Sequence, residues 1–205
     1  MYIWYSCGSA LQLWYHSYMP AYSLLIIASW AVFLIVWALG AMTMKPDVKS
    51  RSGTFWFWRV VIIFLLVYLA ERTGTVHIPN HLMFQLSPMA GWVGAALSIV
   101  GVAIAIWARV HLGRNWSSHP TFKTEHELVT SGPYAYVRHP IYTGVILALL
   151  GSVCIGYSYT LIIAVGVIIM FIVRIRKEER IMLSLFPDQY PPYQARTKKL
   201  IPFIW

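Results

Sequence analysis

Four residues of this chain have the types and spacing to bind an anionic ligand. Arg138 and His139, followed by Pro140, stand before residues 141–154, a stretch with no charged side chain. Arg174 and Glu178 follow a second apolar stretch, and their four-residue separation puts them on one helical face. A guanidinium suits a carboxylate or phosphate, and a carboxylate suits ribose hydroxyls. One interpretation of the two pairs is therefore a binding site for an acidic group and for hydroxyl groups such as those of ribose.

A second interpretation fits each pair equally well. Pro140 suits the first position of a helix, whose N–H groups attract anions. The arginine before it can instead bind a lipid headgroup phosphate while the histidine caps the helix. The second pair can be an ion pair between adjacent helical turns and no more, although arginine before glutamate is the less favourable order. Glu179 is expected to point about 100° away from the face that carries Glu178.

The helices that must position these residues belong to a membrane protein. Of the 205 residues, 59% are hydrophobic and 11% are charged, and the mean hydropathy is +0.62. These values lie outside the range of soluble domains. The sequence predicts one all-α, polytopic membrane domain with five transmembrane helices, of which the second requires Arg59 to snorkel. The predicted spans cover residues 21–44, 55–69, 88–107, 141–156 and 159–173.

The distribution of lysine and arginine predicts the orientation. Fifteen of the 16 basic residues lie in three segments on one side of this arrangement, and only Arg72 lies on the other. The positive-inside rule places the N-terminus outside and the C-terminus in the cytoplasm. The short loops favour a prokaryotic inner membrane. On this interpretation the net charge of +9 sets the topology and attracts anionic lipid. We expect no nucleic-acid partner.

The last two predicted spans form a tight antiparallel hairpin. Only residues 156–158 link them, so Arg138 and His139 at the start of one span must lie close to Arg174 and Glu178 at the end of the other. Two long polar segments flank this hairpin, a cytoplasmic loop over residues 111–138 and a tail over residues 174–205. The hairpin therefore brings the two charged pairs to one place at the membrane surface.

Three other patterns are assigned to structure rather than to chemistry. His77 and His81 have no third ligand, so the sequence predicts no metal site. Cys7 and Cys154 are far apart in the chain and are expected to form no disulfide. A stripe of small residues in the third span is typical of helix packing; it consists of Gly94, Ser98, Gly101 and Ala105.

Two longer motifs carry a resemblance to a known family. They read ELVTSGPYAYVRHPIYTG over residues 127–144 and RIRKEERIMLSLFPDQYPPYQARTKKLIP over residues 174–202. Joined by the hairpin, they resemble the isoprenylcysteine carboxyl methyltransferase family, integral-membrane enzymes that use S-adenosylmethionine. The resemblance makes residues 111–205 the catalytic half. Residues 1–110, with spans one to three, match the family only in being hydrophobic.

The resemblance implies a role for individual residues. The arginine that binds the acceptor carboxylate falls on Arg174, and the carboxylate that holds the cofactor ribose falls on Glu178. Arg176 and Lys177 stand where eukaryotic members carry acidic residues, so the ribose assignment rests on alignment alone. The implied cofactor contacts are His119, His126, Glu127, Leu128, Val129, Tyr134, His139, Pro140, Ile141, Tyr142 and Glu178.

The implied reaction transfers a methyl group from S-adenosylmethionine to a lipophilic acceptor and leaves S-adenosylhomocysteine. A carboxylate is ionised at neutral pH and needs no general base, which favours a prenylcysteine-like acceptor. Phospholipid N-methyltransferases and small-thiol S-methyltransferases share this architecture and remain alternative functions. A membrane sterol-reductase-like protein, which needs more spans, and a non-enzymatic scaffold are the alternatives from other classes. The expected partners are the acceptor and membrane lipids, with no obligate protein partner.

Overall fold

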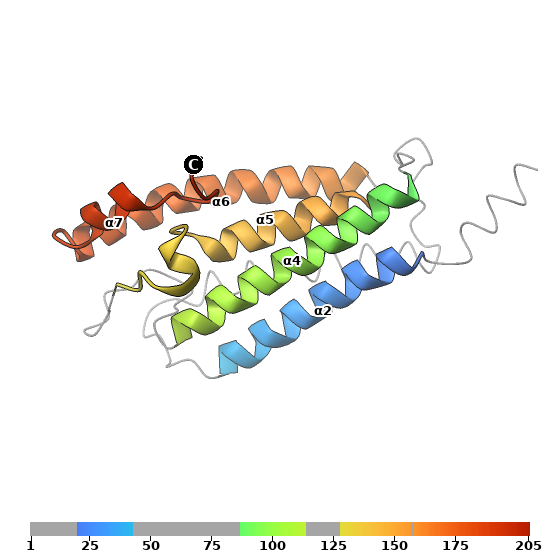
Figure 1. Cartoon of the computed structure of the whole chain (residues 1–205), viewed down its shortest axis with the longest axis horizontal. Coiled ribbons are helices and arrows are strands. Elements are labelled where there is room, and N and C mark those ends of the chain that lie inside the picture. Colours follow the sequence, from blue (N-terminus) through green and yellow to red (C-terminus); the bar gives the residue numbers. More distant parts are fainter. Residues whose placement is uncertain (1–19, 43–86, 114–127, 157) are drawn as a thin grey trace, which may run out of the picture.

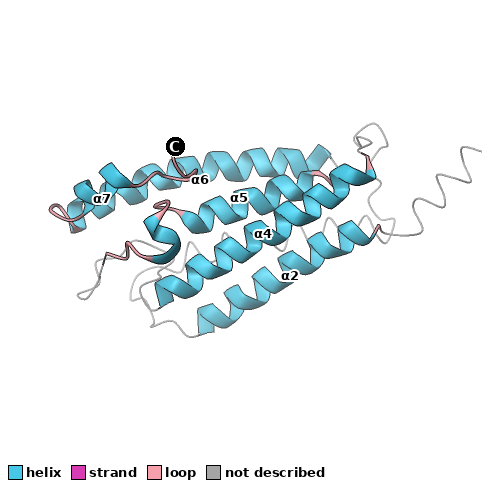
Figure 2. Cartoon of the chain, in the orientation of Figure 1, coloured by secondary structure: helices cyan, strands magenta, loops and turns pink. Residues whose placement is uncertain are grey.

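The described part of the chain is a row of long helices. The computed structural model describes residues 20–42, 87–113, 128–156 and 158–205. The long helices lie side by side in chain order (Figures 1 and 2), and the described residues include no strand, so the predicted all-α class is confirmed for them. The elements are α2 (Ala21–Met42), α4 (Pro88–Leu112), the short 3-10 helix η3 (Gly132–Ala135), α5 (Pro140–Val153), α6 (Ser158–Leu185) and α7 (Tyr190–Arg196).

Glycines bring the backbones of α4 and α5 together. The two helices run antiparallel, with Gly101 facing Gly144 and Gly94 facing Gly151. A Cβ atom added at Gly101 would lie 2.5 Å from the carbonyl oxygen of Gly144 and from the amide nitrogen of Ala148. No side chain is tolerated at such a distance. The predicted small-residue stripe is therefore confirmed as a packing surface.

Helix α2 adds a polar and aromatic contact to this pair. The hydroxyls of Ser29 in α2 and Ser98 in α4 are hydrogen bonded at 2.8 Å, and both side chains are buried. Trp30 donates its indole N–H to the hydroxyl of Ser152 in α5 at 2.9 Å. Phe33 is 2% exposed and stacks on Trp37. Each buried polar group of this contact thus has a partner, as an apolar surrounding requires.

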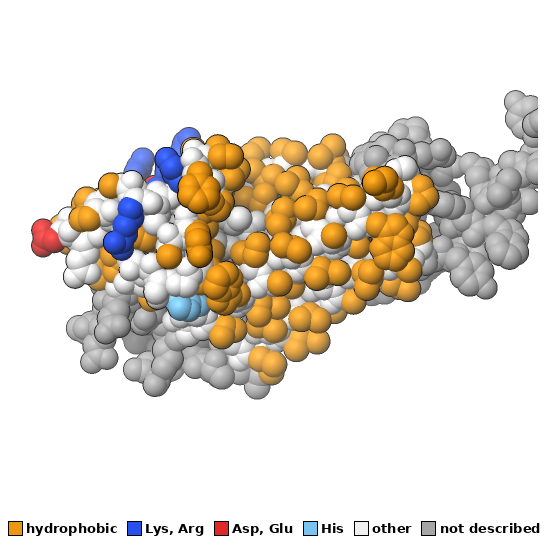
Figure 3. All heavy atoms as spheres, viewed as in Figure 1, with side chains coloured by type: hydrophobic (Ala, Val, Ile, Leu, Met, Phe, Trp, Pro, Cys, Tyr) orange, Lys and Arg blue, Asp and Glu red, His pale blue; other side chains and the backbone are white. Residues whose placement is uncertain are grey.

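The surface of the helices is largely apolar. Figure 3 shows hydrophobic side chains over the middle of the molecule and the Lys and Arg side chains gathered at one end. Two described helices, Ala21–Gly40 and Pro88–Leu112, are long and apolar enough to cross a membrane, and Pro140–Val153 is a shorter apolar helix. The second predicted span, residues 55–69, lies outside the described residues. The five-span topology therefore stays a prediction.

Helix α6 extends far beyond the predicted span. It continues to Leu185, whereas the span was expected to end at Val173. Hydropathy locates the apolar part of a helix, but Arg, Lys, Glu, Met and Leu all have high helix propensity and carry the helix onward until shortly before Pro187. Helix α5 begins at Pro140, as predicted. The polar end of α6 thereby becomes a rigid support for two glutamates.

Candidate functional site

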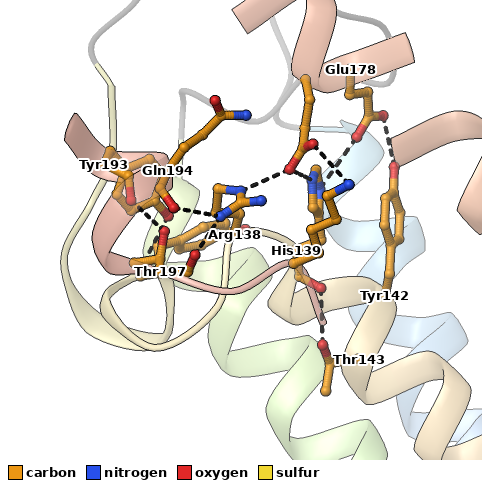
Figure 4. Close-up of polar contacts among 11 residues, drawn as sticks. Arg138, His139, Tyr142, Thr143, Glu178, Tyr193, Gln194 and Thr197 are labelled. Atoms are coloured by element: carbon orange, nitrogen blue, oxygen red, sulfur yellow. Dashed lines mark hydrogen bonds and ion pairs between the residues drawn. The ribbon is translucent and has the colours of Figure 1, made fainter. Parts of the chain in front are cut away.

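The charged pairs meet at the start of α5, beside the polar end of α6 and the segment that follows α6 (Figure 4). From here on, this segment, residues 186–205, is called the tail. The Nε atom of Arg138 lies 2.7 Å from Oε1 of Glu179. The predicted proximity of the two ends of the hairpin is confirmed. His139 occupies the N-cap position of α5, but its side chain makes no capping hydrogen bond. The ring of His139 makes other contacts instead.

The His139 ring lies flat against Tyr142 and between two carboxylates. The ring planes differ by 7°, and their centroids are 5.5 Å apart. Nδ1 is 3.7 Å from Oε2 of Glu178, and Nε2 is 3.7 Å from Oε1 of Glu179. The side chain is only 10% exposed, and Nε2 is buried with no hydrogen-bond partner among the described residues. Because such an atom is costly to leave unsatisfied, this position favours a polar ligand.

Glu178 links α5 to α6. Its Oε1 accepts hydrogen bonds from the Tyr142 hydroxyl at 2.7 Å and from Nε of Arg174 at 2.8 Å. The Tyr142 ring also stacks on Phe171 at 4.4 Å between centroids. The ion pair that the spacing of Arg174 and Glu178 predicted is therefore present. The Arg174 side chain keeps 40% of its surface exposed, against 19% for Glu178, so the arginine is the more exposed partner of this pair.

The expectation that Glu179 points away from the site is wrong. Its carboxylate lies between Arg138 and His139 and is 3.5 Å from Nζ of Lys199. Burial alone raises the pKa of this carboxyl, but His139, Arg138 and Lys199 outweigh burial and lower the pKa to about 2. Because α6 is contacted by α5 on one side and by the tail on another, two consecutive glutamates reach the same cluster from different faces.

Arg138 holds the tail against the start of α5. Its Nη1 donates to the carbonyl oxygens of Gln194 and Thr197. Its backbone N–H donates to the Lys198 carbonyl at 2.8 Å, and the N–H of His139 donates to the Lys199 carbonyl at 3.0 Å. One guanidinium thus joins α6, the end of α7 and the loop before α5. This arrangement fixes the backbone that presents His139.

The turn before α5 is fixed from two sides. Tyr134 in η3 is 7% exposed, and its carbonyl accepts a hydrogen bond from the buried Tyr193 hydroxyl at 2.7 Å. His111 at the end of α4 stacks on Tyr134 and is hydrogen bonded to Ser131 at 2.9 Å. Burial raises the pKa of Tyr134 far above its usual value and that of Tyr193 to about 12. Gly132, with φ 59°, permits the close approach of the His111 ring.

Comparison with known proteins assigns the chain to a family. The model of the isoprenylcysteine carboxyl methyltransferase (ICMT) family matches residues 94–184. The protein-S-isoprenylcysteine O-methyltransferase of Schizosaccharomyces pombe is 36% identical over 159 residues, which cover 72% of this chain and 67% of that protein. The chain belongs to the isoprenylcysteine carboxyl methyltransferase family. The resemblance carried by the two C-terminal motifs is thereby confirmed.

Two further comparisons set the extent of the likeness to other proteins. The cobalt-zinc-cadmium resistance protein CzcN of Cupriavidus metallidurans is 32% identical over 158 residues, covering 75% of this chain and 64% of CzcN. The chain therefore spans a little under two thirds of that relative's length. A solved structure of the eukaryotic intramembrane Ras methyltransferase ICMT has a TM-score of 0.55 and 22% identity, covering 88% of this chain and 68% of that one. The fold is thus an ICMT-like helical fold.

The structure brings four of the predicted site residues of this ICMT-family chain into one cluster, His139, Tyr142, Arg174 and Glu178. Pro140 is buried and Ile141 is half-buried in the first turn of α5, while Leu128 and Val129 are half-buried in the loop before η3. Tyr134 contacts His111 and Tyr193 instead of the cluster's rings. His119, His126 and Glu127 lie outside the described residues. No group of three or more His, Cys, Asp or Glu in the described ranges is arranged to hold a metal ion.

Sequence reasoning missed four residues that support the site from α6, from the tail and from α4. Glu179, Lys199, Tyr193 and His111 all contribute contacts. Two signals pointed to Glu179, since it adjoins Glu178 and a buried carboxylate needs a basic partner such as Arg138. No local pattern marks Tyr193 or His111, because their partners come from distant parts of the chain.

Proposed function

We propose that this protein is an S-adenosylmethionine-dependent methyltransferase that methylates the carboxylate of a lipophilic, prenylcysteine-like acceptor. One observation carries the proposal. Three groups converge at the edge of an apolar surface: the Glu178 carboxylate, the buried His139 imidazole with its unsatisfied nitrogen, and the partly exposed Arg174 guanidinium. A polar cofactor and an acidic lipid need this combination of groups side by side.

The residues fit the proposed cofactor. His139 Nε2 offers a hydrogen bond to the amino-acid carboxylate, and Glu178 accepts from ribose hydroxyls. The family resemblance also assigns Tyr142, whose ring stacks on His139 and Phe171, and Tyr134 to the cofactor. When bound, S-adenosylmethionine supplies the activated methyl group. The family resemblance adds Pro140 and Ile141 in the first turn of α5 and the loop residues His119, His126, Glu127, Leu128 and Val129 as further contacts.

Arg174 is the proposed partner of the acceptor carboxylate. Its guanidinium has five N–H donors in a fork that matches a carboxylate, and it lies at the polar end of α6, next to apolar residues exposed along that helix. The acceptor's acidic head then stops at Arg174 while its lipid part stays in the membrane. The ionised acceptor needs no general base, so the chain's own contribution is to position both ligands and exclude water.

Equilibrium binding of S-adenosylhomocysteine to the detergent-purified protein tests the cofactor assignment. We expect saturable binding, weakened by about 2 to 3 kcal/mol in Glu178→Ala, the range for hydrogen bonds to a charged group. Arg176→Ala, which removes an exposed charge two residues away, serves as the control and should bind as the wild type does. A wild-type protein that does not bind S-adenosylhomocysteine at all would indicate a reductase-like protein or a scaffold.

A methyl-transfer screen then tests the acceptor. With labelled cofactor, prenylcysteine analogues should be methylated, and phosphatidylethanolamine and small thiols should not. Arg174→Ala should raise the acceptor KM or lower kcat more than it weakens S-adenosylhomocysteine binding, and Arg174→Lys should rescue poorly, because a point charge does not reproduce the fork. Arg174 also pairs with Glu178. A loss of cofactor affinity equal to that of Glu178→Ala would therefore assign Arg174 to the cofactor site.

The proposed orientation puts this site on the cytoplasmic side of a prokaryotic inner membrane. The start of α4 and the turn after α6 lie at opposite ends of the helical row (Figure 1). After replacement of Cys7 and Cys154, a cysteine at Asp188 should react with an impermeant reagent only from the cytoplasmic side, and one at Ser87 only from outside. The reverse pattern would overturn the orientation.

A further inference from the structure

A small pocket lies outside the proposed active site, on the other side of the tail. It has a volume of about 110 Å³ and lies between the turn after η3 and the last residues of the chain. Two cationic and two aromatic side chains contribute to its wall. Its lining consists of Ala135, Tyr136, Arg196, Lys198, Pro202 and Phe203.

The cations of this pocket differ from the neighbouring cation of the active-site cluster. Lys199 turns inward to Glu179, whereas Lys198, which pairs with Val137 through the backbone, has an exposed side chain. Arg196 is exposed too, and it lies over the Tyr193 ring at 5.7 Å. Neither Lys198 nor Arg196 forms a salt bridge with any acidic residue in the described part of the chain. The pocket therefore presents two positive charges that no described Asp or Glu side chain neutralises.

The aromatic side chain of Phe203 in this wall has an unfavourable backbone conformation and would be unfavourably exposed in water. Phe203 is 90% exposed and has φ 66°, a conformation that a bulky residue rarely adopts. The turn is closed by the N–H of Ile204 donating to the carbonyl of Ile201, and Ile204 is itself 74% exposed. A glycine or asparagine at position 203 would suit an aqueous turn better. If the side chains of Phe203 and Ile204 face lipid, this explains both their exposure and the strained backbone at Phe203.

The pocket lies at the height where a membrane surface is expected. The chain ends alongside α6 in Figure 1, and at this place in Figure 3 the hydrophobic surface meets the group of Lys and Arg side chains. Phosphate groups of lipids occupy this level, and aromatic side chains are enriched there. Two clustered cations favour anionic over zwitterionic lipid, since each basic residue near the surface is attracted by the negative charge of the lipid.

We propose that this pocket binds the phosphate headgroup of an anionic phospholipid, with Arg196 and Lys198 on the phosphate and Phe203 and Ile204 in the adjoining acyl region. The bound lipid ties the tail to the membrane. Because backbone carbonyls of the same tail segment accept the hydrogen bonds that fix Arg138 and His139, the pocket lies on the back of the active-site support. The inference does not depend on methyl transfer.

Native mass spectrometry of the full-length protein tests the proposal. The detergent-purified protein is equilibrated with equal amounts of phosphatidylglycerol and phosphatidylcholine of the same chain length, and the retained lipids are counted. The wild type should retain one phosphatidylglycerol molecule in preference to phosphatidylcholine. The double variant Arg196→Ala/Lys198→Ala should reduce that preference on the order of tenfold. An unchanged preference would overturn the proposal.

A matched control separates a site from net charge. Arg176→Ala/Lys177→Ala also removes two exposed cations, from the polar part of α6, and should keep the preference. An equal loss in both double variants would show a general charge effect and no pocket. Phe203→Gly, which the positive φ tolerates without loss of folding, should lower lipid retention several-fold. Competition by soluble glycerol phosphate at the lipid's own concentration would identify a soluble phosphate ligand instead and overturn the lipid assignment.

Depth measurement gives a second readout. Spin labels at positions 204 and 188, in a protein without Cys7 and Cys154, are compared in nanodiscs that contain phosphatidylglycerol. The label at 204 should be more accessible to oxygen than to a water-soluble nickel complex, and the label at 188 should show the opposite. Equal access of the nickel complex to both positions would place the end of the chain in water or against another protein and contradict the proposal.

Discussion

Two contact regions of this molecule are built on opposite principles. Between α4 and α5, Gly94, Gly101, Gly144 and Gly151 remove side chains so that the backbones touch. Where α5, α6 and the tail meet, Arg138, Glu178 and Glu179 are held by charge, with distances of 2.7 to 2.8 Å between donors and acceptors. The first region is a rigid support that tolerates no added atom. The second keeps polar groups buried next to the membrane, where they are costly unless each has a partner or a ligand.

The difference separates structural residues from residues available for function. The helix contact is complete by shape alone, and nothing in it calls for a ligand. In the polar junction, Glu179 is surrounded by basic partners, whereas His139 Nε2 makes no hydrogen bond among the described residues. Arg174 pairs with Glu178 and keeps 40% of its side chain exposed. The function is expected at the unsatisfied nitrogen of His139 and at the exposed part of Arg174.

The largest effect is expected from breaking the Arg138–Glu179 pair. Arg138→Met removes the charge that neutralises a buried carboxylate and the donor to two tail carbonyls. We expect the stability to fall by about 3 to 5 kcal/mol, the typical result of removing one partner of a buried pair. Thermal unfolding in detergent measures it. The double variant Arg138→Met/Glu179→Met should recover part of the loss; no recovery would mean that the tail contacts, and not the ion pair, hold the junction.

A smaller effect is expected in the helix contact. Gly101→Ala places a methyl group 2.5 Å from two backbone atoms of α5 and should destabilise the protein by about 1 to 3 kcal/mol through overpacking. Gly166→Ala in α6 is the matched control, because a Cβ there meets nothing within 4 Å, and it should leave stability unchanged or improve it. Similar losses in both variants would show that the close approach of α4 and α5 does not decide the result.

The smallest effect is an acid sensitivity that belongs to Glu179. Its pKa is lowered to about 2 in the folded protein, while an unfolded glutamate titrates near 4.3. The carboxylate therefore contributes stability that is complete above about pH 5 and is lost as the pH falls toward 2. Unfolding temperatures between pH 6 and pH 3 should decline more steeply in the wild type than in Glu179→Gln. Parallel declines would mean that other carboxylates govern acid unfolding.

The sequence predicted the elements better than their polar ends. Uncharged stretches and Pro140 located α2, α4 and α5 within a few residues, because hydropathy and the missing proline N–H act locally. The predicted span ended at Val173, because hydropathy does not follow the charged part of α6; the helical spacing of Arg174 and Glu178 indicated that the helix continues, but not that it ends at Leu185. The short link between the last two spans also predicted that Arg138 lies near the end of α6, and it does.

The arrangement within the site was only partly predictable. Helical spacing identified the pairing of Arg174 with Glu178. It failed for Glu179, because periodicity gives the direction of a side chain but not what lies there, and the tail occupies that direction. The contact of Tyr193 with the Tyr134 carbonyl joins residues 59 positions apart, and no local pattern encodes such a contact. Long-range partners of this kind need the three-dimensional structure.

The affinity of the variant His139→Phe for S-adenosylhomocysteine tests the central claim most directly. Phenylalanine keeps the flat contact with Tyr142 and removes both ring nitrogens, so the unfolding temperature should change little. If Nε2 binds the cofactor carboxylate, isothermal titration should show an affinity at least about tenfold below that of the wild type, as expected for a lost hydrogen bond to a charged group. A folded His139→Phe protein that binds S-adenosylhomocysteine as tightly as the wild type would contradict the account.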